Sequence, residues 1–309
     1  MRLGFGLLHV GEAAASPDNI VKVCKQAESL GYESLYVVDR VFWALQPKSP
    51  YPASPDGRLP DQFKTVIDPL EVLAFAAAHT SKMMLGTSVM NLPYYNPVLL
   101  ARQLTAIDVL SKGRLILGLG LGWSADEFEA VGTPFKERGS RASEALQVLR
   151  TIWTTDPVEF NGKYYKIPKS AISLKPVQKP YPPIYMGAFT QEAIKRAARY
   201  ADGWMPSGIP VAGVAQMFAG MKKMAEEFGR DPSKFKLIVR SHPYLYDKPL
   251  GDDRRIFTGS ADQLKADVAA IRKLGADELF FDVQFIPGIV TLEQNLDLMD
   301  RLMKIARSA

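Results

Sequence analysis

The sequence predicts an α/β fold, a single (β/α)8 TIM barrel with insertions at the carboxyl-terminal face of its strands. Short β-rich runs alternate with helical patterns from one end of the 309-residue chain to the other, and eight such units are present. Strict alternation implies a parallel sheet with right-handed crossovers. Eight units favour a closed barrel, because open doubly wound sheets more often have about five or six strands. We therefore expect residues 1–309 to form one barrel domain.

The strands are short apolar runs. They are predicted at 2–8, 34–38, 83–89, 114–120, 183–187, 202–206, 236–241 and 278–283.

Helix start signals lie between these strands. Ser16-Pro17, Asp68-Pro69 and Asn96-Pro97 each place an N-cap residue before a proline, which has no N–H to lose at the first helical position. Gly31 ends the first helix, and Ser260 with Gln263 has the spacing of a capping box. Later helices are expected at 190–200, 212–228, 260–273 and 291–306.

Three connections are too long for simple loops: 40–67, 156–182 and 243–259. The first is rich in proline, and the second suggests a β-hairpin around Asn161-Gly162. Barrel active sites are built from loops at the carboxyl ends of the strands, so we expect the long loops to be lids. The segment 156–182 differs because it precedes the fifth strand.

Composition narrows the function. The net charge is +5 and the pI about 9.1, but the basic residues are scattered, which slightly favours anionic ligands and argues against nucleic acid. No leading segment or run is apolar enough for a signal peptide or a membrane span. Cys24, the one cysteine, lies on the apolar face of the first helix, where we expect it to pack in the core; a lone cysteine fits the cytoplasm.

The chemistry carried by side chains alone is limited. Three dispersed histidines and one cysteine give no metal-ligand spacing, so no metal is expected. A nucleophile elbow and a P-loop lysine are also missing from the sequence. Because the sequence offers no strong nucleophile or metal site of its own, we infer that the protein uses an organic cofactor.

The stretch "GRLILGLGLGW" (113–123) places Gly118, Gly120 and Gly122 on alternate positions, with Trp123 after them. As a dinucleotide-binding motif it is weak, because the last glycine of that motif is absent. Two interpretations stay open. The glycines make room for bulky side chains of neighbouring strands, or Gly120 and Gly122 let a flat ring approach the backbone.

Polar residues mark the predicted strand ends: His9, Asp39, Arg40, Ser88, Asn91, Asp202 and His242. His9 ends the first strand and is a catalytic candidate, although a structural role is the commoner one for such a histidine. Asp39 and Arg40 are adjacent and would point to opposite sides of a strand, so each needs another partner unless both are solvated. Gly187 ends the fifth strand and Thr190 N-caps the next helix, a place suited to an anion.

Four segments together resemble the luciferase-like (bacterial luciferase) superfamily, in its branch that uses the deazaflavin coenzyme F420. They are "AESLGYESLYVVDR", "LGTSVMNLPYYNPVLLARQLTAIDVLSKGRLILGLGLGW", "FKERGSRASEALQVLRTIWTTDPVEFNGKYY" and "KPYPPIYMGAFTQEAIKRAARYADGWMP". They cover residues 1 to about 210. As a set they are specific for the superfamily, but they distinguish less well between members that use F420 and members that use FMN.

The resemblance implies that the cofactor ring lies at the carboxyl ends of the barrel strands. It implies that Asp39 contacts the deazaflavin and that a non-proline cis peptide, Ser88-Val89, lies behind the ring. It further implies that the backbone of Gly120, Leu121 and Gly122 contacts the ring or its ribityl chain, and that the turn Gly187, Ala188, Phe189 and Thr190 binds the phosphate.

Two departures from the family pattern bear on the reaction. F420-dependent sugar-phosphate and alcohol dehydrogenases carry His where this chain has Arg40, and the sugar-phosphate enzymes carry Glu where it has Trp123. Arginine is a poor base but anchors a carboxylate, phosphate or enolate oxygen, so Arg40 is a catalytic candidate for a reductase. Trp43, Tyr94 and Trp123 would line an aromatic, largely apolar substrate pocket.

Three functions follow. The first is an F420-dependent oxidoreductase acting on an apolar or aromatic small molecule. The second is an FMN-dependent two-component monooxygenase supplied by a separate flavin reductase. The third is a non-catalytic flavin or deazaflavin carrier. Either enzyme would need a partner that reduces its cofactor, and a homodimer is the habit of the family.

Overall fold

The computed structural model describes residues 1–54, 56–286 and 288–309. Eight parallel strands form a closed barrel in the order β3-β2-β1-β13-β10-β9-β8-β5, and β5 pairs with β3 to close it. The predicted (β/α)8 barrel is confirmed. These strands are β1 (Arg2–Gly6), β2 (Ser34–Val37), β3 (Met84–Thr87), β5 (Leu115–Gly120), β8 (Ile184–Met186), β9 (Gly203–Trp204), β10 (Lys236–Ser241) and β13 (Glu278–Phe281).

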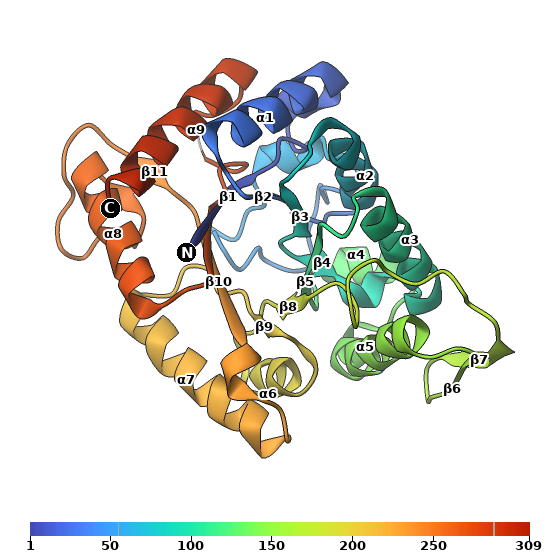
Figure 1. Cartoon of the computed structure of the whole chain (residues 1–309). Helices are drawn as coiled ribbons and strands as arrows, with labels where there is room; N and C mark the ends of the chain where they lie inside the picture. Colours follow the sequence, from blue (N-terminus) through green and yellow to red (C-terminus); the bar gives the residue numbers. More distant parts are fainter. Residues whose placement is uncertain (55, 287) are drawn as a thin grey trace.

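Helices surround the barrel (Figure 1). Those that follow or precede barrel strands are α1 (Pro17–Leu30), α2 (Pro69–His79), α3 (Pro97–Leu110), α5 (Arg138–Thr154), α6 (Gln191–Tyr200), α7 (Val211–Glu227), α8 (Ala261–Leu274) and α9 (Leu292–Arg307). A short α4 (Ala125–Ala130) is added after β5. Single 3-10 turns are η1 (Glu12–Ala15), η2 (Asp61–Lys64), η3 (Leu92–Tyr94), η4 (Phe135–Glu137) and η5 (Pro232–Lys234).

The predicted helix caps are mostly confirmed. The Asp68 carboxylate accepts from the Leu70 N–H at 2.8 Å, the Asn96 side chain accepts from the Val98 N–H, and Ser260 with Gln263 forms the capping box. Gly31 ends α1 in the left-handed region, with φ 81°. Ser16 is the exception: it occupies the N-cap position of α1, but its hydroxyl makes no capping hydrogen bond.

The core has an outer layer between strands and helices and an inner layer within the barrel. Tyr36, Ile116, Tyr185, Met205, Ile238 and Phe280 form the inner layer. The rings of Tyr36 and Phe280 stack at 4.2 Å, so the barrel is packed through and a ligand must bind at its mouth. Cys24 is fully buried in the outer layer, where burial raises the pKa of its thiol to about 12. Its expected core position is confirmed.

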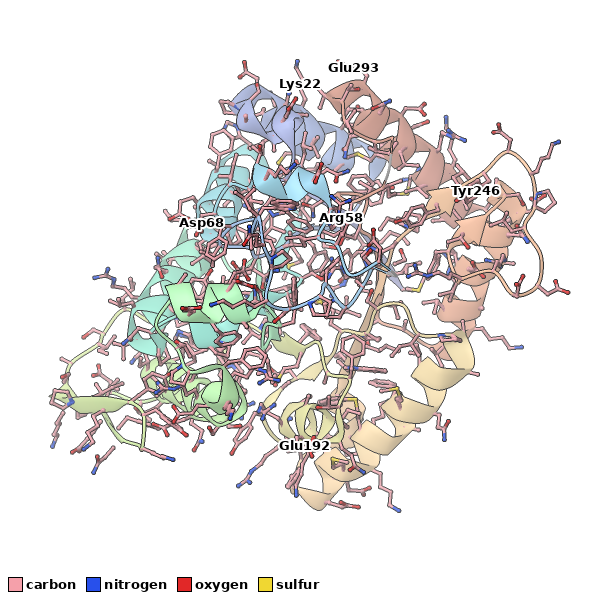
Figure 2. All side chains as sticks on the ribbon, turned by 180° about the vertical axis from the view of Figure 1, so that it is seen from behind. Lys22, Arg58, Asp68, Glu192, Tyr246 and Glu293 are labelled. Atoms are coloured by element: carbon pink, nitrogen blue, oxygen red, sulfur yellow. The ribbon has the colours of Figure 1, made fainter. Side chains whose placement is uncertain are left out.

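The long connections carry short elements of their own. The segment 40–67 is tied to the end of β1 by an antiparallel bridge between Val10 and Val66. The hairpin predicted in 156–182 is present as β6 (Val158–Asn161) and β7 (Lys166–Ser170), and 243–259 contains β11 (Tyr244–Leu245) and β12 (Thr258–Gly259). A last short strand, β4 (Met90–Asn91), pairs with the end of β5. Figure 2 shows the molecule from behind, and Arg58 of the 40–67 segment lies there inside the ring of helices.

None of the helices within the described residues is long and apolar enough to cross a membrane.

Candidate active site at the barrel mouth

Asp39 follows β2 and lies at the mouth, 5% exposed. Its carboxylate accepts from the Asn91 N–H at 2.7 Å and from the Tyr95 hydroxyl at 3.1 Å. Burial raises the pKa of Asp39 to about 6, and these two hydrogen bonds oppose the rise. Asp39 is therefore held by β4 and the turn after it, and its carboxyl exchanges protons near neutral pH.

Arg40 turns away from the Asp39 carboxylate and pairs with Glu127 of α4. Its Nη2 lies 2.6 Å from Glu127 Oε2, and both side chains are buried. Arg40 Nε donates to the Asp39 backbone carbonyl, and the guanidinium stacks 4.9 Å from the centre of the Trp123 ring. The expectation that Asp39 and Arg40 need separate partners is confirmed, and the solvated alternative is wrong.

Glu127 is the residue that sequence reasoning missed. Besides Arg40, it accepts from the Val41 N–H at 2.8 Å and from the Tyr94 hydroxyl at 2.9 Å. A signal existed, because Ser124 and Glu127 have capping-box spacing and the Ser124 hydroxyl does accept from the Glu127 N–H. The carboxylate does not reach back to the cap. It binds Arg40 and the start of the 40–67 segment instead.

Ser88-Val89 is a cis peptide bond between β3 and β4, as the family resemblance implied. Ser88 is 1% exposed, and its hydroxyl finds no hydrogen-bond partner among the described residues. A Cβ built on Gly120 would lie 2.5 Å from Val89 Cγ2, and one built on Gly187 would lie 3.5 Å from Val89 Cγ1. The fold thus brings together the ends of β3, β5 and β8, where the ring was expected.

Gly118 of β5 and Gly122, two residues after this strand, are explained by their protein neighbours. A Cβ on Gly118 would lie 2.0 Å from the Thr87 carbonyl oxygen, and one on Gly122 would lie 2.9 Å from the Tyr94 hydroxyl. Gly122 also has φ 76°, which disfavours any side chain. These contacts support the first interpretation, room for neighbouring segments, and require no ligand.

The turn after β8 leads directly into the N-terminus of α6. Thr190 is the N-cap of α6, where its hydroxyl accepts from the Ala193 N–H. Ala188 is buried and its carbonyl accepts from the Trp204 indole N–H at 3.0 Å, whereas Phe189 is exposed. This contact holds the turn against β9 and leaves the first N–H groups of α6 at the surface.

His9 lies at the end of β1 but is fully buried. Its Nδ1 donates to the Leu7 carbonyl at 2.9 Å, and its Nε2 accepts from the Val38 N–H at 3.1 Å. Burial lowers its pKa, so the ring stays neutral and joins the ends of β1 and β2. With both ring nitrogens bonded to backbone, His9 has no free atom for the catalytic role expected of it, and we interpret it as structural.

The three residues that were expected to line an aromatic pocket do not lie together in the structure. Tyr94 and Trp123 lie beside Arg40, and the Trp123 ring contacts Tyr51 of the 40–67 segment at 5.3 Å. Trp43 packs elsewhere, with Phe63 and Val10, and donates to the Leu59 carbonyl. It stabilises the inserted segment rather than joining the other two.

A second arginine–carboxylate pair lies across the mouth. Arg240 of β10 donates through Nε to Asp282, which follows β13, at 2.8 Å. His242 Nδ1 lies 3.9 Å from the same carboxylate, and burial followed by the nearby Arg240 charge lowers the His242 pKa to about 4. Burial raises the pKa of the Tyr51 hydroxyl, and the nearby charges of Arg240 and Arg40 oppose this rise.

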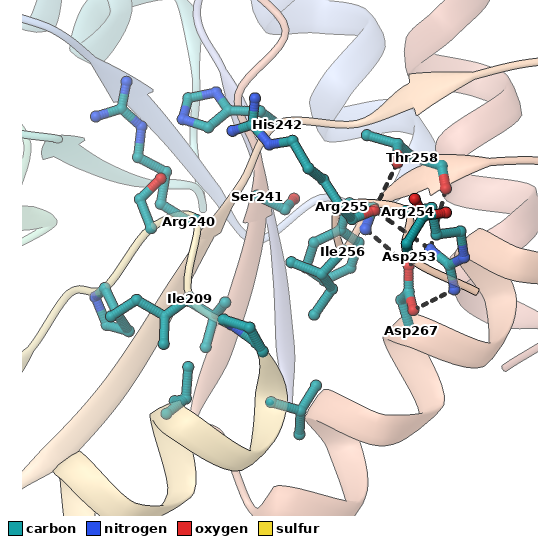
Figure 3. A pocket seen from close by; sticks show the side chains of 18 of the residues that line it. Ile209, Arg240, Ser241, His242, Asp253, Arg254, Arg255, Ile256, Thr258 and Asp267 are labelled. Carbon is teal, nitrogen blue, oxygen red and sulfur yellow. Dashed lines mark hydrogen bonds and ion pairs between the residues drawn. The ribbon is translucent and has the colours of Figure 1, made fainter. Parts of the chain in front are cut away.

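Next to this pair is a cavity of about 400 Å³. Residues 206–211 after β9, the end of β10 and residues 252–258 of the third insertion line it. Figure 3 shows the Arg255 side chain extending toward His242 on one side, while Arg254 is held by Asp267 on the other. None of the residues predicted for the substrate pocket lines this cavity, but the insertion that covers it was predicted as a lid.

Asp202 is not at the mouth. It precedes β9, and its carboxylate accepts from the Ile184 N–H at 2.9 Å at the start of β8. It was predicted as the first residue of the strand 202–206, and it lies one residue before β9, at the amino end of that strand. Within the described ranges, three or more His, Cys, Asp or Glu residues nowhere gather in a way that could hold a metal ion.

The barrel, the cis peptide and the buried acid at the end of β2 are features that the family resemblance implied. Residues 1–250 match the luciferase-like monooxygenase family, and the chain belongs to it.

Among its relatives, an uncharacterised protein of Mycobacterium tuberculosis is 33% identical over 224 residues, which is 72% of this chain and 76% of that protein. The F420-dependent glucose-6-phosphate dehydrogenase of Amycolatopsis mediterranei is 30% identical over 208 residues, 64% of this chain and 57% of that one. The FMNH2-dependent dimethylsulfone monooxygenase of Pseudomonas putida is 33% identical over 140 residues, 44% and 38% of the two chains.

Two solved structures share the fold along the whole chain. The monooxygenase RslO1 from Streptomyces bottropensis superposes with a TM-score of 0.78 at 21% identity, covering 100% of this chain and 99% of that one. An F420-dependent secondary alcohol dehydrogenase in complex with an F420–acetone adduct gives 0.78 at 17% identity, covering 99% of each chain. The glucose-6-phosphate dehydrogenase and the alcohol dehydrogenase are named for F420, and the dimethylsulfone monooxygenase is named for reduced FMN.

Proposed function

We propose that this protein is an F420-dependent oxidoreductase that reduces a small, electron-poor organic substrate. The observation that carries the proposal is Asp39, which is buried at the end of β2 and hydrogen-bonded to Asn91 and Tyr95. In the F420-using members that the sequence resembles, the aspartate at this position contacts the deazaflavin. The relative from Amycolatopsis, which uses F420, supports the same branch.

The residues at the mouth fit such a cofactor. The Ser88 hydroxyl is buried without a partner among the described residues, and a buried polar group in that state is costly unless a ligand completes it. Gly187 leaves ordinary contact distance to Val89, so the backbone there is open to close approach. The N–H groups at the start of α6 suit the phosphate. When bound, the deazaflavin would supply a two-electron hydride carrier.

The protein's own part in the reaction is assigned to Arg40 and its partners. Glu127 and the Asp39 carbonyl hold the Arg40 Nη2 and Nε, and Nη1 has no hydrogen-bond partner within the described part of the chain. Nη1 would bind a carbonyl or nitro oxygen and stabilise the negative charge that develops there. Burial followed by the nearby Glu127 charge raises the pKa of Tyr94, which keeps its hydroxyl protonated beside this site.

An FMN-dependent two-component monooxygenase is the second candidate. It is supported by Ser88, Gly187 and the α6 N-terminus, because the ring and the phosphate that they would contact are common to FMN and F420. The Pseudomonas putida relative uses reduced FMN. Either enzyme would need a separate protein to reduce its cofactor. A non-catalytic carrier is less well supported, because Arg40 is buried, oriented and not fully bonded.

Equilibrium titration with F420 and with FMN separates the two cofactors. We expect F420 to bind in the micromolar range or tighter and FMN to bind at least about tenfold more weakly, a difference of one decade in Kd. Micromolar affinity for FMN with no binding of F420 would overturn the proposal. Oxidation of reduced F420 in the presence of enones and nitroaromatics then tests for catalysis, and a protein that binds F420 but turns over none of them is a carrier.

Arg40→Lys tests the anchoring role with the charge retained. Lysine cannot contact Glu127, the Asp39 carbonyl and a substrate oxygen through one planar group. We expect kcat/KM to fall about a hundredfold, by analogy with the loss of one preorganised hydrogen-bond donor, with F420 affinity within a few-fold of wild type. Unchanged turnover in both Arg40→Lys and Arg40→Ala would show that Arg40 does not contact the reacting substrate.

A further inference from the structure

We propose that a groove on the outside of the barrel, between α5, the β6–β7 hairpin and α6, binds the chain of carboxylates that F420 carries beyond its phosphate. This inference rests on the proposed function. The groove has a volume of about 480 Å³. It is lined by Ser140, Ser143, Glu144, Gln147, Lys163, Tyr164, Glu192, Lys195, Arg196, Arg199 and Tyr200.

The groove is positively charged. Lys163, Lys195, Arg196 and Arg199 contribute four cations, and within the described residues no carboxylate lies in ion-pair contact with any of them. Of the two carboxylates in the lining, Glu144 is engaged by backbone. It accepts from the N–H groups of Lys163, Tyr164 and Tyr165, which fixes the turn of the hairpin. Glu192 offsets part of the remaining charge and leaves an excess of cations.

Arg196 supplies unused hydrogen-bonding capacity in the wall of the groove. Its Nε donates to the Ser143 hydroxyl of α5 at 2.8 Å, which holds the side chain between the two helices. Its Nη1 is buried and has no hydrogen-bond partner among the described residues. A buried guanidinium N–H without an acceptor is costly, and a carboxylate in the groove would satisfy it.

The lining of the groove on α6 begins at Glu192, two residues after the turn expected to hold the phosphate. Helix α6 begins directly after Thr190, and Glu192, Lys195, Arg196 and Arg199 recur on one face at helical spacing. With a rise of 1.5 Å per residue, Lys195 lies about 7 to 8 Å and Arg199 about 13 to 14 Å along the axis from the N-cap. Each residue of an extended chain spans about 3.5 Å, so a tail of a few carboxylates covers this distance.

FMN gives the groove nothing to bind, because FMN ends at its phosphate. The groove is therefore a feature of this chain that distinguishes between the two cofactors, whereas the ring and phosphate contacts do not. Several of the basic residues that are scattered along the sequence lie together in this groove, along the expected path of an anionic tail.

The experiment is a fluorescence titration of the full chain with F420 that carries several glutamates and with the form that ends before the first glutamate. Wild type is compared with Lys163→Glu/Lys195→Glu, which reverses one charge on each side of the groove. The matched control is Lys265→Glu/Lys273→Glu, which makes the same change on exposed positions of α8. Circular dichroism and the melting temperature check that all three fold alike.

We expect the tailed cofactor to bind wild type and the α8 control about tenfold more tightly than the tail-less one, the sum expected of a few screened surface ion pairs. In the groove variant this ratio should fall below about threefold, with affinity for the tail-less form unchanged, and raised salt should lower the wild-type ratio in the same way. Equal affinity for both forms in wild type, or a ratio that survives in the groove variant, overturns the groove proposal and leaves the proposed function intact. Failure of both forms to bind overturns both.

Discussion

Strands β2 and β13 carry buried polar groups at both ends, but the base and the mouth of the barrel are built differently. At the base, Glu278 is fully buried and accepts from the Tyr36 hydroxyl at 2.7 Å and from the Ser34 hydroxyl. Arg2 lies 2.8 Å from its other oxygen. All four residues belong to three neighbouring strands, so the cluster forms within the barrel itself. Glu278 Oε2 has no hydrogen-bond partner among the described residues, and its charge is balanced by the Arg2 ion pair.

At the mouth, the buried carboxylates of Glu127 and Asp39 depend on segments outside the barrel. Glu127 comes from α4 and binds the 40–67 segment, and Asp39 is held by groups that follow β3. Two polar atoms near the mouth, Ser88 Oγ and Gln284 Oε1, are buried without partners among the residues described. The base cluster is thus built from barrel strands alone, whereas the mouth depends on segments added to the barrel and buries two uncharged polar atoms without protein partners in the described part of the chain.

Removing the base carboxylate should have the largest effect on folding. Glu278→Ala leaves the Ser34 and Tyr36 hydroxyls and the Arg2 charge without their acceptor, and it opens a cavity. We expect the free energy of unfolding to fall by about 3 kcal/mol, as for other buried pairs that lose one partner. Urea denaturation followed by circular dichroism measures it.

The same variant should leave the mouth unaffected, with F420 affinity of the folded fraction within about twofold of wild type. Glu278→Gln is the matched control, because it keeps the shape and one acceptor and should lose less stability. A loss of cofactor affinity in Glu278→Ala at full folding would mean that base and mouth are coupled, contrary to the division drawn between them.

Removing the charge of Glu127 should have the opposite profile. Glu127→Gln keeps the shape but leaves Arg40 without its buried anion, so the guanidinium loses its fixed position beside Trp123. We expect kcat/KM to fall about a hundredfold through lost orientation. The loss of stability should be about 1.5 to 3 kcal/mol, because the Gln amide oxygen can still accept a hydrogen bond from Arg40. Steady-state kinetics with reduced F420 and any accepted substrate measure the first effect.

The control for Glu127 lies on the same helix. Glu129→Gln removes an exposed carboxylate that pairs with Lys48, and an exposed pair contributes little. Its kinetics and stability should match those of wild type. If Glu127→Gln behaves like Glu129→Gln, the Arg40–Glu127 pair is a structural contact without a part in turnover.

The contrast between base and mouth also explains what could be predicted from the sequence. Strand and helix positions come from local signals, such as the Asn96-Pro97 cap and the apolar run before Gly118, and they are right to within a few residues. Because all parallel strands end at one face, the order of strands along the chain is enough to place Asp39, Ser88, Gly120 and Gly187 together.

The partners of these residues could not be predicted. Glu127 reaches Arg40 and Val41 across more than eighty positions of sequence, and Arg240 meets Asp282, which follows a different strand. Nothing in the local pattern of "SADEFEA" or "DVQF" states which way those carboxylates turn. Trp43 was misplaced for the same reason: its neighbours are set by how the 40–67 segment folds back on β1 and β2.

The smallest of these effects is a pH dependence that belongs to the mouth alone. Burial raises the pKa of Asp39 to about 6, against about 3.9 in an unfolded chain. Between those values the folded state binds the proton that the unfolded state has lost, so stability from this group is present at low pH and is lost as pH rises through 6. From pH 5 to pH 7 wild type should lose about 1 kcal/mol more than Asp39→Asn, which has no proton to release.

Urea denaturation of both proteins at the two pH values, without added cofactor, measures this difference directly. Asparagine can still accept from the Asn91 N–H, so the two proteins differ mainly in the titrating group. Equal pH dependence in both would mean that the Asp39 carboxyl titrates as it does in water, and that the Asn91 and Tyr95 hydrogen bonds outweigh its burial. The Glu278 variants should not change this pH dependence, because the base cluster lies at the far end of β2 and shares none of these hydrogen bonds.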